Sequence, residues 1–142
     1  MKTFFSQKGA AAIEMALIMP ILLVLTFGLV EFGLLMYNQQ VLTNAAREGA
    51  RRGIVQASPR VPYSNGVDGI ADTVHTYADT HLVTFGAVKP TPNVNVPAIC
   101  SNFADNLSVT VTYPYTFLVI PNFVPGLSPS LTLKTASVMK CE

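Results

Sequence analysis

The sequence has few of the residues from which binding and catalytic sites are usually built. Its 142 residues include two histidines, two cysteines and no tryptophan, and charged residues make up 12% of the chain. Nine basic and eight acidic side chains give a formal net charge of +1, so there is no basic excess to neutralise a phosphate backbone. Two cysteines are too few for a four-cysteine zinc site. The composition therefore argues against nucleic-acid binding and against a structural zinc site.

The motifs of the common enzyme classes are also missing. The sequence contains no HExxH, GxSxG, P-loop or GxGxxG pattern. The most suggestive polar group is Asp72, His75 and Asp79, whose spacing places them on one face of a helix, where they could bind a metal. Because this face lies opposite an apolar stripe, solvated side chains are the simpler interpretation. We therefore predict a protein that is not an enzyme, with no catalytic residues, no metal site and no cofactor.

The apolar residues are concentrated near the N-terminus. The run from Met15 to Val30 carries no charge, and Glu14 and Glu31 bracket it. As a helix, the segment from Ala10 to Glu31 would measure about 33 Å, against about 30 Å for the hydrocarbon core of a bilayer. A secretory signal has a shorter apolar region that ends at a cleavage site, whereas here a second helical segment follows. We therefore expect a membrane-resident helix.

The residues around this run form an ordered set of features. Gly9 is followed by AAAIE, Pro20 lies within the apolar run, an EFG triplet occupies residues 31–33, and TNAAREGAR closes the segment. From about Gln7 to Gly53 the sequence resembles the TadE-like family of pseudopilins. These are minor subunits of the tight-adherence (Tad, or Flp) branch of bacterial type IV pili.

The resemblance implies how the N-terminus is processed. A prepilin peptidase would remove a leader of residues 1–9 by cutting between Gly9 and Ala10. Glu14 would become the fifth residue of the mature chain. Because a carboxylate in hydrocarbon costs at least ~2.5 kcal/mol and needs a partner, Glu14 would pair with the new α-amine of its own or a neighbouring subunit and set the axial register. Pro20 removes one helix hydrogen bond and is expected to kink or locally unwind the span.

The resemblance also implies a function, partners and a location. The protein would support assembly of a Tad-type adhesive pilus, or enter it in small amounts. Its partners would be other pilin and pseudopilin subunits, the prepilin peptidase and the inner-membrane Tad assembly platform. The helix would cross the bacterial inner membrane once, with the C-terminal domain outside.

Two alternatives to this function stay open. The first is the major subunit of a pilin-like helical filament. Major pilins of this branch are much shorter and usually have Tyr after the glutamate, where this chain has Met15, and both differences favour a minor pilin. The second is a single-pass membrane anchor whose extracytoplasmic domain binds a ligand.

The long helix is expected to continue beyond the membrane, over residues 10–57 with a membrane part of about 10–37. Ala45, Gly49 and Gly53 recur every four residues. Such a stripe of small residues lets another helix or a sheet approach closely. Two interpretations stay open, namely packing against the protein's own domain and contact with another subunit.

The remaining residues predict a linker and a small domain. Residues 58–66 are rich in proline, serine and glycine and are typical of a linker, and residues 67–142 form the predicted extracytoplasmic domain. Apolar residues at helical spacing from Val67 to Phe85 predict a second helix, with Asn65 as its N-cap and Gly86 as its end.

Three or four short strands are expected after this helix. Val94 and Val96 indicate a weak strand, the alternation from Leu107 to Tyr113 indicates the clearest one, and residues 131–139 indicate the last. Pro114 is expected to interrupt the second strand before an apolar run resumes. The predicted fold is α+β, with the short helix packed on a small antiparallel sheet. That the long helix packs on this sheet too is implied by the resemblance to pilins.

Cys100 and Cys141 lie at the two ends of the predicted sheet region. If the domain lies outside the inner membrane, its compartment permits a disulfide between them. Closing a loop of about 40 residues would stabilise the domain by roughly 4 kcal/mol on the chain-entropy model. Two free buried thiols are the alternative.

Overall fold

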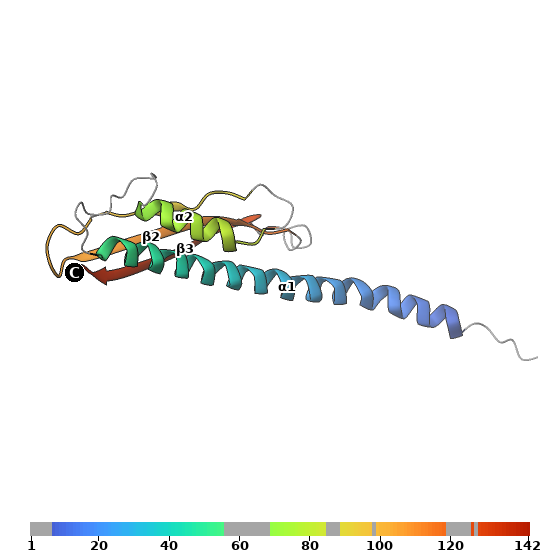
Figure 1. The fold of residues 1–142 in the computed structure, drawn as a ribbon. Helices are drawn as coiled ribbons and strands as arrows, with labels where there is room; N and C mark the ends of the chain where they lie inside the picture. Colours follow the sequence, from blue (N-terminus) through green and yellow to red (C-terminus); the bar gives the residue numbers. More distant parts are fainter. Residues whose placement is uncertain (1–6, 56–68, 85–88, 98, 119–125, 127) are drawn as a thin grey trace, which may run out of the picture.

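Helix α1 (Gln7–Ile54) is 48 residues long and extends far beyond the rest of the molecule (Figure 1). At 1.5 Å per residue it measures about 72 Å. The helix begins within the predicted leader, continues through Pro20 and ends at Ile54 rather than at residue 57. Its N-terminal half stands clear of the domain, and its C-terminal half lies along the sheet (Figure 1). A computed structural model describes residues 7–55, 69–84, 89–97, 99–118, 126 and 128–142.

Three strands form one antiparallel sheet in the order β1-β2-β3. Strand β1 (Asn93–Asn95) is short, whereas β2 (Asn106–Thr116) and β3 (Ser130–Lys140) have 11 residues each. The long pair is in register along its whole length, from Asn106 opposite Lys140 to Thr116 opposite Ser130. The long apolar helix, the short helix and the antiparallel sheet confirm the predicted α+β fold.

Pro114 does not interrupt β2, contrary to the prediction. The backbone hydrogen bonds at both ends of the pair, Cys141 N–H to the Asp105 oxygen (2.8 Å) and Phe117 N–H to the Pro129 oxygen (3.1 Å), join odd-numbered residues. The even-numbered residues of β2 therefore direct their backbone groups toward β1. Since β1 begins at Asn93, opposite Thr112, Pro114 has no β1 residue opposite it and its missing N–H costs no bond of the ladder.

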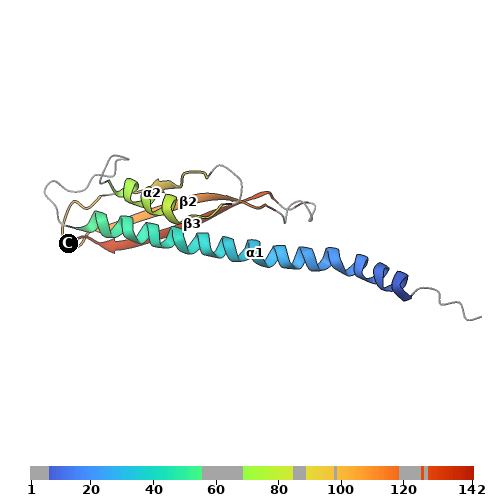
Figure 2. The same ribbon diagram turned by 45° about the vertical axis from the view of Figure 1, so that its right-hand side comes forward.

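Both helices cover the same face of the sheet, and the core lies between them (Figures 1 and 2). The odd-numbered residues of β2 point into this core, where they meet small and aliphatic residues of α1 and of helix α2 (Ile70–His81). The opposite face of the sheet carries the even-numbered residues, which are exposed or half-buried. The main members of the core are Leu42, Ala45, Ala46, Ala50, Ile70, Val74, Leu107, Val109, Val111 and Tyr113.

Helix α2 is shorter than the apolar spacing predicts. It begins after Gly69, which serves as the N-cap without a side-chain hydrogen bond, and the expected cap Asn65 lies outside the described residues. It ends at His81 because Leu82 adopts an extended backbone and the next residue, Val83, is hydrogen-bonded to α1. The residues that were expected to end it, 85–86, lie outside the described part of the chain.

Candidate functional site

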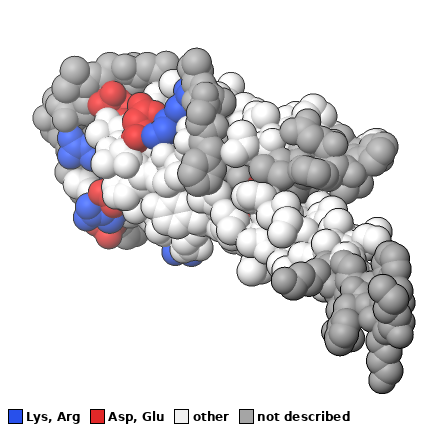
Figure 3. Space-filling model, turned by 90° about the vertical axis from the view of Figure 1, so that its right-hand side faces the viewer, with Lys and Arg blue, Asp and Glu red and all other residues white. Residues whose placement is uncertain are grey.

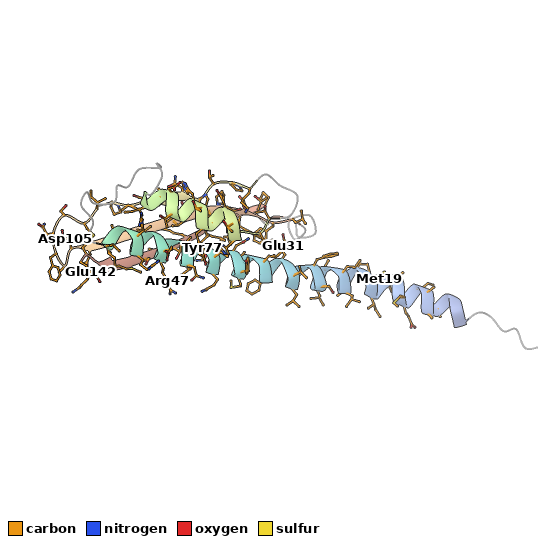
Figure 4. The ribbon with its side chains drawn as sticks, in the orientation of Figure 1. Met19, Glu31, Arg47, Tyr77, Asp105 and Glu142 are labelled. Carbon is orange, nitrogen blue, oxygen red and sulfur yellow. A yellow bond between two sulfur atoms is a disulfide. The ribbon has the colours of Figure 1, made fainter. Side chains whose placement is uncertain are left out.

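The N-terminal half of α1 is an apolar surface that the domain leaves uncovered. From Gly9 to Val30 each residue is exposed, apart from Gly28, which is half-buried. Met19 projects from this half, well away from the domain (Figure 4). Within the described residues, α1 is the one helix that is long and apolar enough to cross a membrane. Such a length of exposed apolar helix fits membrane anchoring, because water does not favour exposing so large an apolar surface.

The residues of the predicted processing site lie in the first turns of this exposed half. Gly9 and Ala10 are helical and exposed, and so is Glu14, one turn further on. The spacing of four residues places Glu14 within reach of an α-amine created at Ala10. Pro20 lies further along the same exposed half, inside the helix.

Burial of α1 begins abruptly at Glu31. This carboxylate is 4% exposed, and one of its oxygens accepts a hydrogen bond from the backbone N–H of Leu118, just after the end of β2. Figure 4 shows Glu31 at the end of the domain where α1 leaves it. A buried carboxylate needs such donors, because an unpaired buried charge is strongly unfavourable. The glutamate therefore fixes the point at which α1 joins the domain.

Asn38 makes a second fixed contact two turns further along. Its side-chain oxygen accepts from the backbone N–H of Val83 at 3.0 Å, and its side-chain nitrogen donates to the Val83 oxygen at 2.8 Å. Asn38 is fully buried, so both of its polar atoms need partners. The pair of bonds fastens the segment after α2 to α1.

The small residues of the predicted stripe face the protein's own domain. Ala45 is fully buried, and a Cβ atom added at Gly49 would lie 2.5 Å from a methyl group of Val74 in α2. A Cβ atom at Gly53 would lie 2.6 Å from Leu107 of β2. These glycines let α2 and β2 approach the backbone of α1 closely.

Cys100 and Cys141 form a disulfide whose Cα atoms are 5.8 Å apart, at the end of the domain far from the exposed helix. The turn that follows Cys100 is held to the C-terminus by a 2.9 Å hydrogen bond from Ala104 N–H to the Cys141 oxygen. Ala104 has φ of +65°, a conformation that is uncommon for a residue with a Cβ atom. The turn presents Phe103 with 83% of its surface exposed.

The polar residues Asp72, His75 and Asp79 lie on α2. His75 shares a 3.0 Å hydrogen bond with the Pro92 oxygen, and Lys89 donates to the backbone oxygen of Asp79 at 2.7 Å. Among the residues that the structure describes, no group of three potential ligands could hold a metal ion. On the surface an ion pair joins Arg51 to Glu48 at 2.7 Å, and its hydrogen bond lowers the pKa of Glu48.

Two tyrosines of β2 lie in the core near the point at which α1 joins the domain. The hydroxyl of Tyr113 is buried without a hydrogen-bond partner among the described residues, and burial, followed by the proximity of Tyr115, raises the pKa of Tyr113. Burial also raises the pKa of Tyr115, and the charge of Glu31 adds to the shift. Sequence alone gave no signal for this cluster or for the exposed Phe103, because both depend on contacts between distant segments.

Comparison with known families agrees with the resemblance seen in the sequence. The family model described as "TadE-like protein" matches residues 9–51, which lie entirely within α1. Neither a curated protein nor a solved structure matches the chain. TadE-like proteins are structural components related to the Tad pilus rather than members of an enzyme family. Residues 9–51 of this chain are therefore similar to TadE-like proteins.

Proposed function

We propose that this protein is a pseudopilin or minor pilin that supports the assembly of a Tad-type adhesive pilus. One observation carries the proposal: the TadE-like match covers a single helix that is exposed and apolar before Glu31 and buried in its own domain after it. A helix of this kind can lie in the membrane first and then exchange lipid for neighbouring apolar helices in a filament. The described part of the domain does not cover the exposed half.

The proposed maturation removes residues 1–9 at the cytoplasmic face of the inner membrane. The prepilin peptidase cuts after Gly9, and the new α-amine of Ala10 lies one helical turn from Glu14. Because both groups are charged and border an apolar phase, their pairing within one subunit or between neighbours stabilises the start of α1 and sets its register. Pro20 supports the transfer from bilayer to filament, since its missing hydrogen bond makes local unwinding less costly.

The domain lies outside the inner membrane in this proposal. The Cys100–Cys141 disulfide supports this side, because disulfides persist in oxidising compartments and are rare in the cytosol. The partners are other pilin and pseudopilin subunits, the prepilin peptidase and the inner-membrane Tad assembly platform. The exposed half of α1 offers the surface through which other subunits are contacted.

The first test determines the N-terminus of the membrane-extracted protein, with and without an active prepilin peptidase. We expect a chain that starts at Ala10 only when the peptidase is active. The variant Glu14→Ala should insert in the membrane and fail to support piliation, whereas Glu48→Ala, a glutamate on the domain half of the same helix, should support it. A start at Met1 in both strains, or normal piliation with Glu14→Ala, would contradict the proposal.

The exposed Phe103 favours one further candidate, a single-pass anchor whose outer end binds another molecule. A rigid turn that displays an aromatic side chain resembles the anchor residues of many binding surfaces. The two functions differ in whether the particular sequence of α1 is required. Replacing residues 11–30 by an unrelated apolar helix preserves the function of an anchor and abolishes that of a pilin, so piliation of this variant separates them.

A further inference from the structure

Six exposed apolar side chains surround the point where α1 leaves the domain. They come from three parts of the fold: α1 just after Glu31, the segment after α2, and the facing ends of β2 and β3. We call this surface the domain base, and its members are Phe32, Met36, Tyr37, Val83, Leu118 and Leu131. Leu118, for example, is 55% exposed although it directly neighbours the buried Glu31.

Hydrogen bonds fix the domain base to α1. Leu118 donates its backbone N–H to Glu31, and Val83 is held by two bonds to Asn38. Leu131 lies opposite Tyr115 in the ladder of β2 and β3, and Tyr115 precedes Leu118 by three residues. The parts of the base that come from the domain are thus tied to the same two turns of α1 and cannot move along the helix independently.

The length of α1 sets the depth of the domain base relative to a bilayer. The segment from Ala10 to Glu31 is about 33 Å long, which matches a hydrocarbon core of about 30 Å. Tyr37 lies six residues beyond Glu31, about 9 Å along the axis, and the headgroup layer on each side is about 5 to 8 Å thick. Glu31 and Phe32 therefore fall in the headgroup layer when the apolar half of α1 spans the core, and Tyr37 lies at the outer edge of that layer.

The charges of the molecule agree with this depth. After the buried Glu31, the next charged residue of α1 is Arg47, so the sequence of the helix at the base offers no charged side chain. Viewed from the end at which α1 emerges, the visible Lys, Arg, Asp and Glu side chains gather over one side of the domain, away from the protruding helix (Figure 3). Tyrosine at such a position is typical of the membrane interface, where its ring meets lipid and its hydroxyl meets water.

We propose that the domain base rests in the headgroup layer of the bilayer that α1 crosses, so that lipid covers its apolar side chains and fixes the tilt of the domain. The inference rests on the proposed function for the membrane-spanning role of α1. The bonded Glu31 fits this placement, because a carboxylate at the edge of the hydrocarbon is stabilised by a backbone N–H donor that the domain supplies. Extraction into a filament then has to remove the base from lipid together with the helix.

The absence of tryptophan allows a direct test in the full-length protein. Three variants each carry one tryptophan: Leu118→Trp at the base, Leu22→Trp in the exposed half of α1, and Phe103→Trp at the far end of the domain. Each is reconstituted into phosphatidylcholine vesicles at low protein-to-lipid ratio, with lipids brominated either near the headgroup or near the chain ends. Circular dichroism that matches the wild type verifies folding in each sample.

We expect lipids brominated near the headgroup to reduce the emission of Leu118→Trp by about half and to leave Phe103→Trp unchanged. Leu22→Trp should be quenched most by lipids brominated near the chain ends. Leu131→Trp provides a second position on the base, and it should behave like Leu118→Trp.

Two results overturn the inference. In the first result, the tryptophans at the base are quenched no more than Phe103→Trp, whereas Leu22→Trp is quenched. The base then lies outside the bilayer, although the membrane-spanning role of α1 in the proposed function is retained. The second is a blue-shifted but unquenched emission at the base that grows with the protein-to-lipid ratio, because a second copy of the chain then covers the base. If Leu22→Trp itself is unquenched, the membrane-spanning role fails and the inference fails with it.

Discussion

The buried hydroxyl of Tyr113 shows how a single residue can limit the stability of this domain. Its oxygen is inaccessible and has no hydrogen-bond partner among the described residues. An unsatisfied buried polar group costs the free energy of removing it from water. The ring itself fills the core between β2 and the helices, so the cost attaches to the oxygen alone.

We expect Tyr113→Phe to raise the free energy of unfolding at pH 7 by about 1 kcal/mol, because it removes an unpaired hydroxyl and keeps the ring. The raised pKa adds a dependence on pH. In the folded state Tyr113 holds its proton above pH 10.0, its ordinary pKa, whereas the unfolded chain releases it. Stability is therefore fully present below pH 10.0 and falls as the pH rises further.

Guanidinium unfolding in detergent between neutral and alkaline pH measures both effects. The alkaline loss of stability should be smaller in Tyr113→Phe than in the wild type, with a remainder from Tyr115, whose pKa is also raised. Tyr37→Phe, at an exposed position on α1, is the matched control and should leave the alkaline loss unchanged. A Tyr113→Phe variant that is less stable at pH 7 would mean that the hydroxyl has a partner.

At the scale of elements, periodic patterns predicted most of what the chain forms. The apolar run predicted α1, and strict alternation predicted β2, since both patterns follow from which face of an element is buried. The end of α2 could not be predicted from its own residues because Val83 is drawn out of the helix by Asn38, 45 residues away. The prediction that Pro114 interrupts β2 was wrong because the effect of a proline depends on whether a neighbouring strand lies opposite it, and β1 begins only at Asn93.

The candidate site likewise has a part that could be predicted from local sequence and a part that could not. The N-terminal motif around Gly9 and Glu14 is local in sequence, and the family match covers it. The anchoring role of Glu31 is not local, because its partner Leu118 lies 87 residues further along the chain. From the sequence, Glu31 served as one boundary of the apolar run and as part of the EFG triplet, and neither use predicted its contact with Leu118. Pairing across such a distance depends on the topology of the sheet, which periodicity alone does not fix.

Packing of α2 on α1 depends on the small residue Gly49. A methyl group there would lie 2.5 Å from Val74, which is fully buried and, as a β-branched residue, has little freedom at χ1. Overpacking costs about 1 to 3 kcal/mol and the better helix propensity of alanine offsets about 1 kcal/mol, so we expect Gly49→Ala to lower the free energy of unfolding by up to about 2 kcal/mol. Denaturant unfolding of the purified chain measures the difference.

Gly33→Ala is the matched control on the same helix. No atom lies within 4 Å of a Cβ atom added at Gly33, so the substitution changes helix propensity without crowding a neighbour. It should leave stability unchanged or raise it by up to about 1 kcal/mol. Equal effects of the two substitutions would show that the glycines matter for the helix itself and not for the approach of α2.

On the scale of the whole molecule, the two halves of α1 have different surroundings. Its residues 9–30 are exposed, apart from the half-buried Gly28, whereas Glu31 and much of the helix after it pack against the core. The TadE-like match runs across both halves, over residues 9–51. The matched residues therefore include both the exposed apolar half of α1 and the half that packs on the protein's own sheet.

This division predicts that the domain folds without the exposed half of α1. A chain of residues 28–142 keeps Glu31, Asn38, the small-residue stripe and the disulfide, and so retains the contacts that bury the core. We expect it to unfold cooperatively, with a free energy within about 0.5 kcal/mol of the detergent-solubilised full chain, because surface changes away from the core have small effects. Circular dichroism with denaturant measures both. A fragment that lacks a cooperative transition would show that residues before Glu31 stabilise the domain, and α1 would then be unable to exchange lipid for other subunits without cost to its own fold.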